Sequence, residues 1–169
     1  MTSYDARSCD LQGTLDLSMF QQFTSNFFVS SNNNLKRIIH TACTKSMTFY
    51  YANQCDITGE HDLSMFTNIG PRFSMYQNSS LTAVTHSYSN SIFSQYSLSN
   101  CGLTGNHDVS MFPNLGDSFR INNKTLLTSV THTASTQVFT EYLISTCDIT
   151  GNHDLSMFPN LGGSFQIHL

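Results

Sequence analysis

The sequence predicts a repeat solenoid, in which short parallel strands of successive coils stack into a sheet. Four of the five cysteines in the 169-residue chain recur every 46 residues, at Cys9, Cys55, Cys101 and Cys147. Each opens a variant of one phrase, such as CDITGEHDLSMF at 55–66. Three further residues halve this period into units of 23 residues: Asn32, Asn78 and Lys124. Apolar residues keep fixed offsets from all seven of these markers.

The strand of each unit is predicted from two apolar residues that lie five and three places before the marker. Before Asn78 they are Phe73 and Met75, with polar Ser74 between them. This alternation is typical of a strand with one buried face. Residues 9–169 then form seven units, and residues 1–8 an incomplete first strand. Since neighbouring parallel strands lie about 4.8 Å apart, we expect one sheet along the whole solenoid.

The markers are expected to turn inward at the strand ends and to form a ladder along the solenoid. An Asn side chain there can satisfy backbone donors and acceptors of adjacent coils, and Cys is a small, weakly bonding substitute. The predicted ladder consists of Cys9, Asn32, Cys55, Asn78, Cys101 and Cys147. Lys124 would extend outward, or Asn123 would take its place through a local slip.

No disulfide is expected among the cysteines. Those of the ladder occupy every second coil, and this places neighbours about 9–10 Å apart. A disulfide needs Cα atoms within about 7 Å, so buried free thiols are predicted.

The second half of each cysteine unit is predicted to be a turn region on the outer side. Its glycines would supply the backbone freedom for a bend: Gly13, Gly59, Gly105 and Gly151. In the phrase D-L-S-M-F, the serine is placed to cap a short helical turn, after which Met and Phe would pack inward. We therefore expect short 3₁₀ or irregular segments on the outer face and little α-helix.

These units resemble the leucine-rich repeat family, whose unit reads L-x-x-L-x-L-x-x-N/C-x-L over about 20–29 residues. The resemblance covers nearly the whole chain, and the Thr-Gly pairs, such as Thr58-Gly59, look like the L-T-G element of plant-type repeats. The chain departs from the pattern where aromatics replace leucine, at Lys124, and at both ends, which differ from standard capping units. The resemblance implies one solenoid domain over 1–169, with a parallel sheet on its concave face.

Composition narrows the classes of function. Charged residues make up 11% of the chain, against about a quarter in typical domains. This favours an extracellular, cell-surface or virion protein over a cytosolic enzyme. The formal net charge of −4 provides no basic stripe for nucleic acid. No stretch is apolar enough for membrane insertion, and the segment MTSYDARS lacks the apolar region of a Sec-type signal peptide.

No catalytic constellation, cofactor motif or metal site is predicted. The chain has no G-x-S-x-G elbow and no G-x-x-x-x-G-K loop, and almost every candidate residue is repeated. The dipeptides His61-Asp62, His107-Asp108 and His153-Asp154 cannot converge on one ion from alternate coils, so structural or surface roles are expected. A second set, His40, His86 and His132, is expected to be partly exposed on the outer face. Only a pair from adjacent coils, such as His86 with His107, has a geometry that a metal titration would test.

The candidate binding surface consists of the strand residues that alternate with the inward ones. These outward positions differ from coil to coil, and solenoids bind partners on such extended sheets. The predicted binding residues are Phe28, Phe49, Tyr51, Arg72, Tyr76, Gln95, Arg120 and Glu141. The aromatic ones among them would form an exposed recognition patch, or would simply pack across strands.

Two alternative functions are predicted, one from the outward strand residues and one from the ends of the solenoid. The first is a non-catalytic recognition module that binds protein or glycan on the concave sheet. The alternative is a structural segment of an extracellular or viral fibre that assembles end to end. The last predicted strand carries Phe165 and Ile167 with no following coil, so self-association through uncapped ends is expected.

Overall fold

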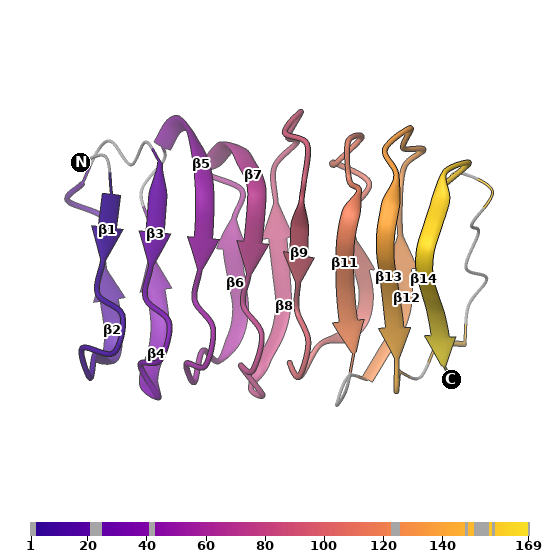
Figure 1. Cartoon of the computed structure of the whole chain (residues 1–169). Coiled ribbons are helices and arrows are strands. Elements are labelled where there is room, and N and C mark those ends of the chain that lie inside the picture. The colour runs from indigo at the N-terminus through magenta and orange to yellow at the C-terminus, as the bar shows by residue number, and fades with distance from the viewer. Residues whose placement is uncertain are drawn as a thin grey trace.

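The computed structural model is a parallel β-solenoid of about six turns (Figure 1). The structure describes residues 3–20, 25–40, 43–122, 126–147, 149–150, 156 and 158–168, with the backbone alone at 43–46. Within these ranges there is no helix, and so none that could cross a membrane. The predicted parallel solenoid is confirmed. The expectations for Asn123, Lys124, Gly151 and the dipeptide His153-Asp154 lie outside the described residues.

The main sheet contains eight parallel strands that follow one another in chain order along the solenoid (Figure 1). They are β1 (Ser3–Asp5), β3 (Asn26–Phe28), β5 (Cys43–Tyr51), β7 (Phe66–Ser74), β9 (Gln95–Ser97), β11 (Asp117–Asn122), β13 (Phe139–Ser145) and β14 (Leu161–His168). The register pairs the inward aromatic residues and their neighbours with those 23 places later, as in Phe27 with Tyr50 and Phe73 with Tyr96, and it shifts by one residue near the starts of β5, β11 and β13. The sequence spacing therefore predicts both the strand order and the register.

Three pairs of short strands form the outer side, where 3₁₀ or irregular segments were expected. The pairs are β2 (Gln12–Asp16) with β4 (Asn34–Ile39), β6 (Gly59–Leu63) with β8 (Leu81–His86), and β10 (Thr104–Asp108) with β12 (Leu126–Thr131). The expectation was wrong because alternate side chains of these segments are buried in the core, as His61 and Leu63 are in β6.

The glycines of the outer strands lie in β-bulges instead of turns. Gly13, Gly59 and Gly105 have φ angles of 65°, 72° and 69°, and the pairing register shifts directly after each of them. The extra residue of each shift lies on the partner strand, and glycine adopts the positive φ opposite it without a steric cost. The bulge lets the strand stay paired while its following residues turn toward the core.

The turns after β2, β6 and β10 are fixed by aspartate, and not by a serine cap. The Oδ1 atoms of Asp16, Asp62 and Asp108 each accept a hydrogen bond of 2.8 Å from the backbone N–H two residues later. Asp62 and Asp108 of the His-Asp dipeptides thus have a structural role as Asx turns. Met19 was expected inside but is 78% exposed, because it lies at the tip of this turn.

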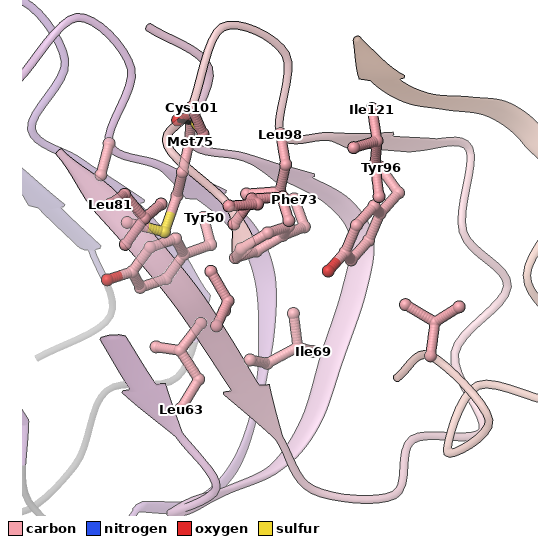
Figure 2. Packing of buried hydrophobic residues seen from close by; sticks show 14 of the residues in the cluster. Tyr50, Leu63, Ile69, Phe73, Met75, Leu81, Tyr96, Leu98, Cys101 and Ile121 are labelled. Carbon is pink, nitrogen blue, oxygen red and sulfur yellow. Dashed lines mark hydrogen bonds between the residues drawn. The ribbon is translucent and has the colours of Figure 1, made fainter. Parts of the chain in front are cut away.

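A column of stacked rings runs through the core beneath the main sheet. Tyrosine and phenylalanine alternate in it: Tyr4, Phe27, Tyr50, Phe73, Tyr96, Phe119, Tyr142 and Phe165. Successive ring centroids lie 4.9 to 5.6 Å apart. Figure 2 shows Tyr50, Phe73 and Tyr96 of this column among the surrounding aliphatic side chains. Each stacked pair adds about 0.5–1.5 kcal/mol beyond the burial of its area.

Asparagine side chains of the ladder connect adjacent coils. Nδ2 of Asn78 donates to the carbonyl oxygens of Ala52 and Met75 at 2.8 and 2.7 Å, and its Oδ1 accepts from the Ile57 N–H at 3.2 Å. Asn32 makes four equivalent bonds. These bonds satisfy buried backbone groups at the point where the strands end.

Cysteines in the ladder make only a weak bond to the same kind of carbonyl. The thiols of Cys55 and Cys101 lie 3.3 and 3.1 Å from carbonyl oxygens of the preceding coil, and both residues are buried, as is Cys147. Cys9 is exposed, so its expected inward place was wrong. The reason is that no described coil precedes Cys9, and its thiol contacts only the nearby Arg7 carbonyl.

Candidate functional site

Histidines from two neighbouring outer strands bind the core tyrosines Tyr50 and Tyr96. Oη of Tyr96 lies 2.9 Å from Nε2 of His86 and 2.7 Å from Nε2 of His107. Tyr50 is bonded in the same way to His40 and His61, at 3.0 and 2.6 Å. We call these two groups the His–Tyr–His triads. Since tyrosine occupies every second coil of the ring column, the triads explain why the sequence repeats over 46 residues and not over 23.

The triads correct the expectation that His40, His86 and His132 are partly exposed. Each of the three is at most 9% exposed, because alternate side chains of the outer strands point to the core. A tyrosine hydroxyl buried among apolar residues needs a partner, and the histidines supply it. A signal for this exists in the sequence, where Tyr and both sets of His share the same 46-residue period.

Burial keeps the triads uncharged at neutral pH. It lowers the pKa of His61 and His107 to about 4, and lowers the pKa of His40 and His86 well below its usual range. In a neutral triad, one imidazole donates to the tyrosine oxygen and the tyrosine hydroxyl donates to the other imidazole. Both Nε2 atoms are therefore engaged in hydrogen bonds and not directed to an ion. Across the described ranges, no three His, Cys, Asp or Glu side chains gather where they could hold a metal.

The outward face of the main sheet is the side opposite the ring column, and it carries the predicted binding residues. Near the N-terminal end, three of them form an aromatic patch: Phe28, Phe49 and Tyr51. Their ring centroids are 5.6 to 6.2 Å apart, and each residue is half-buried. The Arg7 guanidinium lies 4.9 Å from the Phe28 ring centroid, and that of Arg72 lies 5.7 Å from the Phe49 ring centroid. The patch therefore presents rings edged by two cations.

A hollow of about 440 Å³ lies on the same face farther along the sheet, and we call it the sheet hollow. It crosses the ends of β7, β9, β11 and β13 and is lined by Tyr76, Gln95, Ser97, Ser99, Arg120, Asn122, Glu141 and Leu143. Small serines on β9 lie between larger neighbours, and Ser97 is only 4% exposed although it points outward. The short side chain of Ser97 between longer neighbouring side chains produces the sheet hollow.

An ion pair is fixed in the wall of the sheet hollow. Glu141 Oε2 accepts from Arg120 Nε at 2.6 Å and lies 2.5 Å from Arg120 Nη2. It also accepts from the Ser118 hydroxyl at 3.1 Å. All three contacts use Oε2. No described residue donates to Oε1, which remains an available acceptor.

A second, shallower hollow of about 330 Å³ adjoins the first, and the two share Gln95 and Arg120. Arg72 lines it, with its Nε 3.4 Å from the Ser94 hydroxyl. All eight predicted binding residues therefore lie on one face, five of them at the two hollows and three in the aromatic patch. The alternation along the strands also predicts outward positions for Ser97, Ser99, Asn122 and Leu143, but these four residues were not among the predicted binding residues.

A smaller hollow of about 250 Å³ lies on the outer side, between β8 and β10, which are not hydrogen-bonded to each other. Its lining includes His86 and His107. Both imidazoles already serve the core tyrosine, and the residues around them repeat in other coils. The variable outward face is therefore the stronger candidate for recognition.

No family model, curated protein or solved structure matches the chain.

Proposed function

We propose that the chain is a non-catalytic recognition module that binds a protein or a glycan through the outward face of its main sheet. The observation that carries this proposal is the contrast between the two sides of the same strands. The inward positions keep Tyr or Phe in every coil, whereas the outward column through Phe28 reads Tyr51, Ser74, Ser97 and Arg120. A constant scaffold with a variable surface is how solenoids bind partners.

The proposal includes the finer fold class and the location. The L-T-G-like elements and the Asn/Cys ladder favour a solenoid of the leucine-rich repeat type. The low charge content favours an extracellular, cell-surface or virion protein. The repetition of nearly all reactive side chains supports a role without catalysis.

Parallel screens against an oligosaccharide array and a displayed protein library test this function. Tyr51→Ala with Arg120→Ala alters the outward face, whereas Arg37→Ala with Thr82→Ala alters exposed residues of the outer strands. We expect ligands of the parent chain to lose binding to the first variant and to bind the second variant as they bind the parent. Binders that ignore the outward change, or no binder in either screen, would contradict the proposal.

A second candidate function is a structural segment of an extracellular or viral fibre that assembles end to end. Among the described residues the ring column runs from Tyr4 to Phe165, which is 40% exposed, so the Tyr4 layer of a second copy stacked on Phe165 would keep the alternation of tyrosine and phenylalanine. A parallel edge strand can pair with another chain. Ile167→Lys should then raise the monomer fraction in analytical ultracentrifugation, with His168→Lys as the matched change. A parent chain that stays monomeric at high concentration would contradict this alternative.

A further inference from the structure

The ion pair of the sheet hollow offers a donor and an acceptor side by side. Among the described residues, the contacts of Glu141 are made only through Oε2, so Oε1 can accept one more hydrogen bond. Arg120 uses Nε and Nη2, and no described acceptor lies at its Nη1. A carboxylate only accepts and a guanidinium only donates. A hydroxyl group does both, so two neighbouring hydroxyls of one ligand match this pair.

The remaining polar groups of the hollow suit the same kind of ligand. Ser99 contributes a hydroxyl and Gln95 an amide, each of which can donate and accept. The Oδ1 atom of Asn122 is buried and has no hydrogen-bond donor among the described residues. The amide can therefore turn toward a ligand without breaking a bond through that oxygen. A ligand hydroxyl would satisfy a group that otherwise carries a desolvation cost.

A tyrosine provides an apolar wall beside these polar groups. Tyr76 is half-buried, and its backbone N–H is held 3.1 Å from Oδ1 of Asn53. Leu143 lines the hollow as well. Small-molecule sites combine apolar walls with a few placed polar groups, and about 440 Å³ falls in their lower size range.

Charge and polarity exclude other ligand classes. An anion would meet the Glu141 carboxylate, whose charge offsets that of Arg120 at 2.5 Å. The centre of a protein interface is usually depleted of charged groups and rich in buried apolar anchors. Here the ion pair and the serine hydroxyls occupy the centre, and the aromatic patch lies to one side.

We propose that the sheet hollow is a subsite for a neutral, hydroxyl-rich carbohydrate, with Glu141 and Arg120 binding two adjacent hydroxyls and Tyr76 contacting the apolar side of the sugar ring. This inference rests on the proposed function, because it names the ligand class of the same face. A longer glycan would continue from Tyr76 toward Tyr51 and the aromatic patch, where further rings are available.

The test is a titration of the ¹⁵N-labelled chain with a panel of free neutral hexoses, N-acetylhexosamines and deoxyhexoses, followed by amide chemical shifts. We expect at least one sugar to bind weakly, with shifts that cluster at Gln95, Ser99, Asn122 and their neighbours. Glu141→Gln should weaken that binding about ten-fold, because it removes a charge-assisted hydrogen bond. Glu60→Gln, the same change at an exposed position of β6, should leave binding unchanged.

A readout beyond loss of binding separates ligand contact from structural damage. Tyr51→Ala should weaken binding of a matching oligosaccharide but not of the single sugar, since Tyr51 lies outside the hollow. The unfolding curve of Glu141→Gln must also match that of the parent. If Glu141→Gln destabilises the chain, Arg120→Lys is tested in its place, because lysine keeps the positive charge but lacks the planar donor group.

The possible results distinguish this inference from the proposed function. Sugars that bind elsewhere, or no sugar binding at all, overturn the carbohydrate subsite. If a protein from the displayed library then maps to the outward face, the recognition function stands and the ligand class was wrong. If neither a sugar nor a protein maps to that face, both proposals fail.

Discussion

Acid should destabilise the fold over a pH range that is set by the buried histidines of the triads. The histidines of the triads are neutral in the folded chain and become protonated far more readily once unfolded. Between about pH 6.5 and pH 4 the unfolded state binds more protons, so the free energy of unfolding falls as the pH falls through this window. Below about pH 4, these histidines no longer change the free energy of unfolding as the pH falls further.

The size of the effect follows from the pKa values. With a folded pKa of about 4 and an unfolded pKa of 6.5, His61 and His107 each lower the free energy of unfolding by about 2 kcal/mol at pH 5. Their sum of about 4 kcal/mol is a large share of the 5–15 kcal/mol of a typical domain. His40 and His86 act in the same direction, because burial also lowers their pKa values.

Urea unfolding at neutral pH and at about pH 5 measures this loss. The combination His86→Leu, Tyr96→Phe and His107→Leu removes one whole triad without leaving a buried polar group alone. Leucine already occupies the position equivalent to His107 in the first unit, as Leu15, and phenylalanine fills the alternate layers of the ring column. We expect this variant to lose at least about 2 kcal/mol less than the parent between the two pH values, because His107 alone accounts for about that amount and His86 adds to it.

The matched change Leu127→Ala, which removes a buried side chain but no ionisable group, should leave the pH dependence as it is. Aspartates such as Asp62, whose pKa is lowered by its bonds to Ser64, contribute only at lower pH. An equal loss in the parent and in the triad variant would refute the assignment of neutral buried histidines. So would a parent chain whose stability is unchanged at about pH 5.

Three further outcomes test the scaffold. Gly105→Val should lower the free energy of unfolding by about 1–3 kcal/mol, because the φ of 69° at this position disfavours a β-branched residue. Thr104→Val on the same strand should change it by no more than about 0.5 kcal/mol. Equal shifts in melting temperature for the two variants would refute the need for glycine at this register shift. Asn78→Ala should lower the free energy of unfolding by about 2 kcal/mol or more in urea unfolding, because it leaves the Ile57 N–H and the Ala52 carbonyl without a partner and the Met75 carbonyl with only the weakly donating Cys101 thiol. Asn78→Cys should cost less, as cysteine fills the adjoining ladder positions, and a reversed order would contradict the ladder. The exposed Cys9 should be alkylated well before Cys101, because burial raises the pKa of the Cys101 thiol to about 12. Similar alkylation rates for the two thiols in mass spectrometry would contradict the burial of Cys101.

The main sheet could be predicted from the sequence because its inward residues are apolar and regularly spaced. The outer strands could not, because they bury His61 and His107, and histidine in a polar phrase suggests a surface. Such burial is favourable only when a tyrosine hydroxyl from the main sheet lies within hydrogen-bond distance. That match depends on the distance across the core, which the spacing along the chain does not give.

The candidate site was partly predictable for a similar reason. Alternation along each strand identifies Arg120 and Glu141 as outward residues, and the 23-residue register places them on adjacent strands. Their ion pair is therefore readable from the sequence. The sheet hollow is not, because it depends on the relative heights of side chains from four strands, with Ser97 lying below Tyr76 and Arg120.

A crystal structure of the chain soaked with the best-binding sugar of the NMR panel would show where the ligand lies. We expect electron density in the sheet hollow, with two adjacent hydroxyls at Glu141 and Arg120 and the ring against Tyr76. Density instead in the hollow between β8 and β10, beside His86, or a sugar bound away from the outward face, would contradict this expectation.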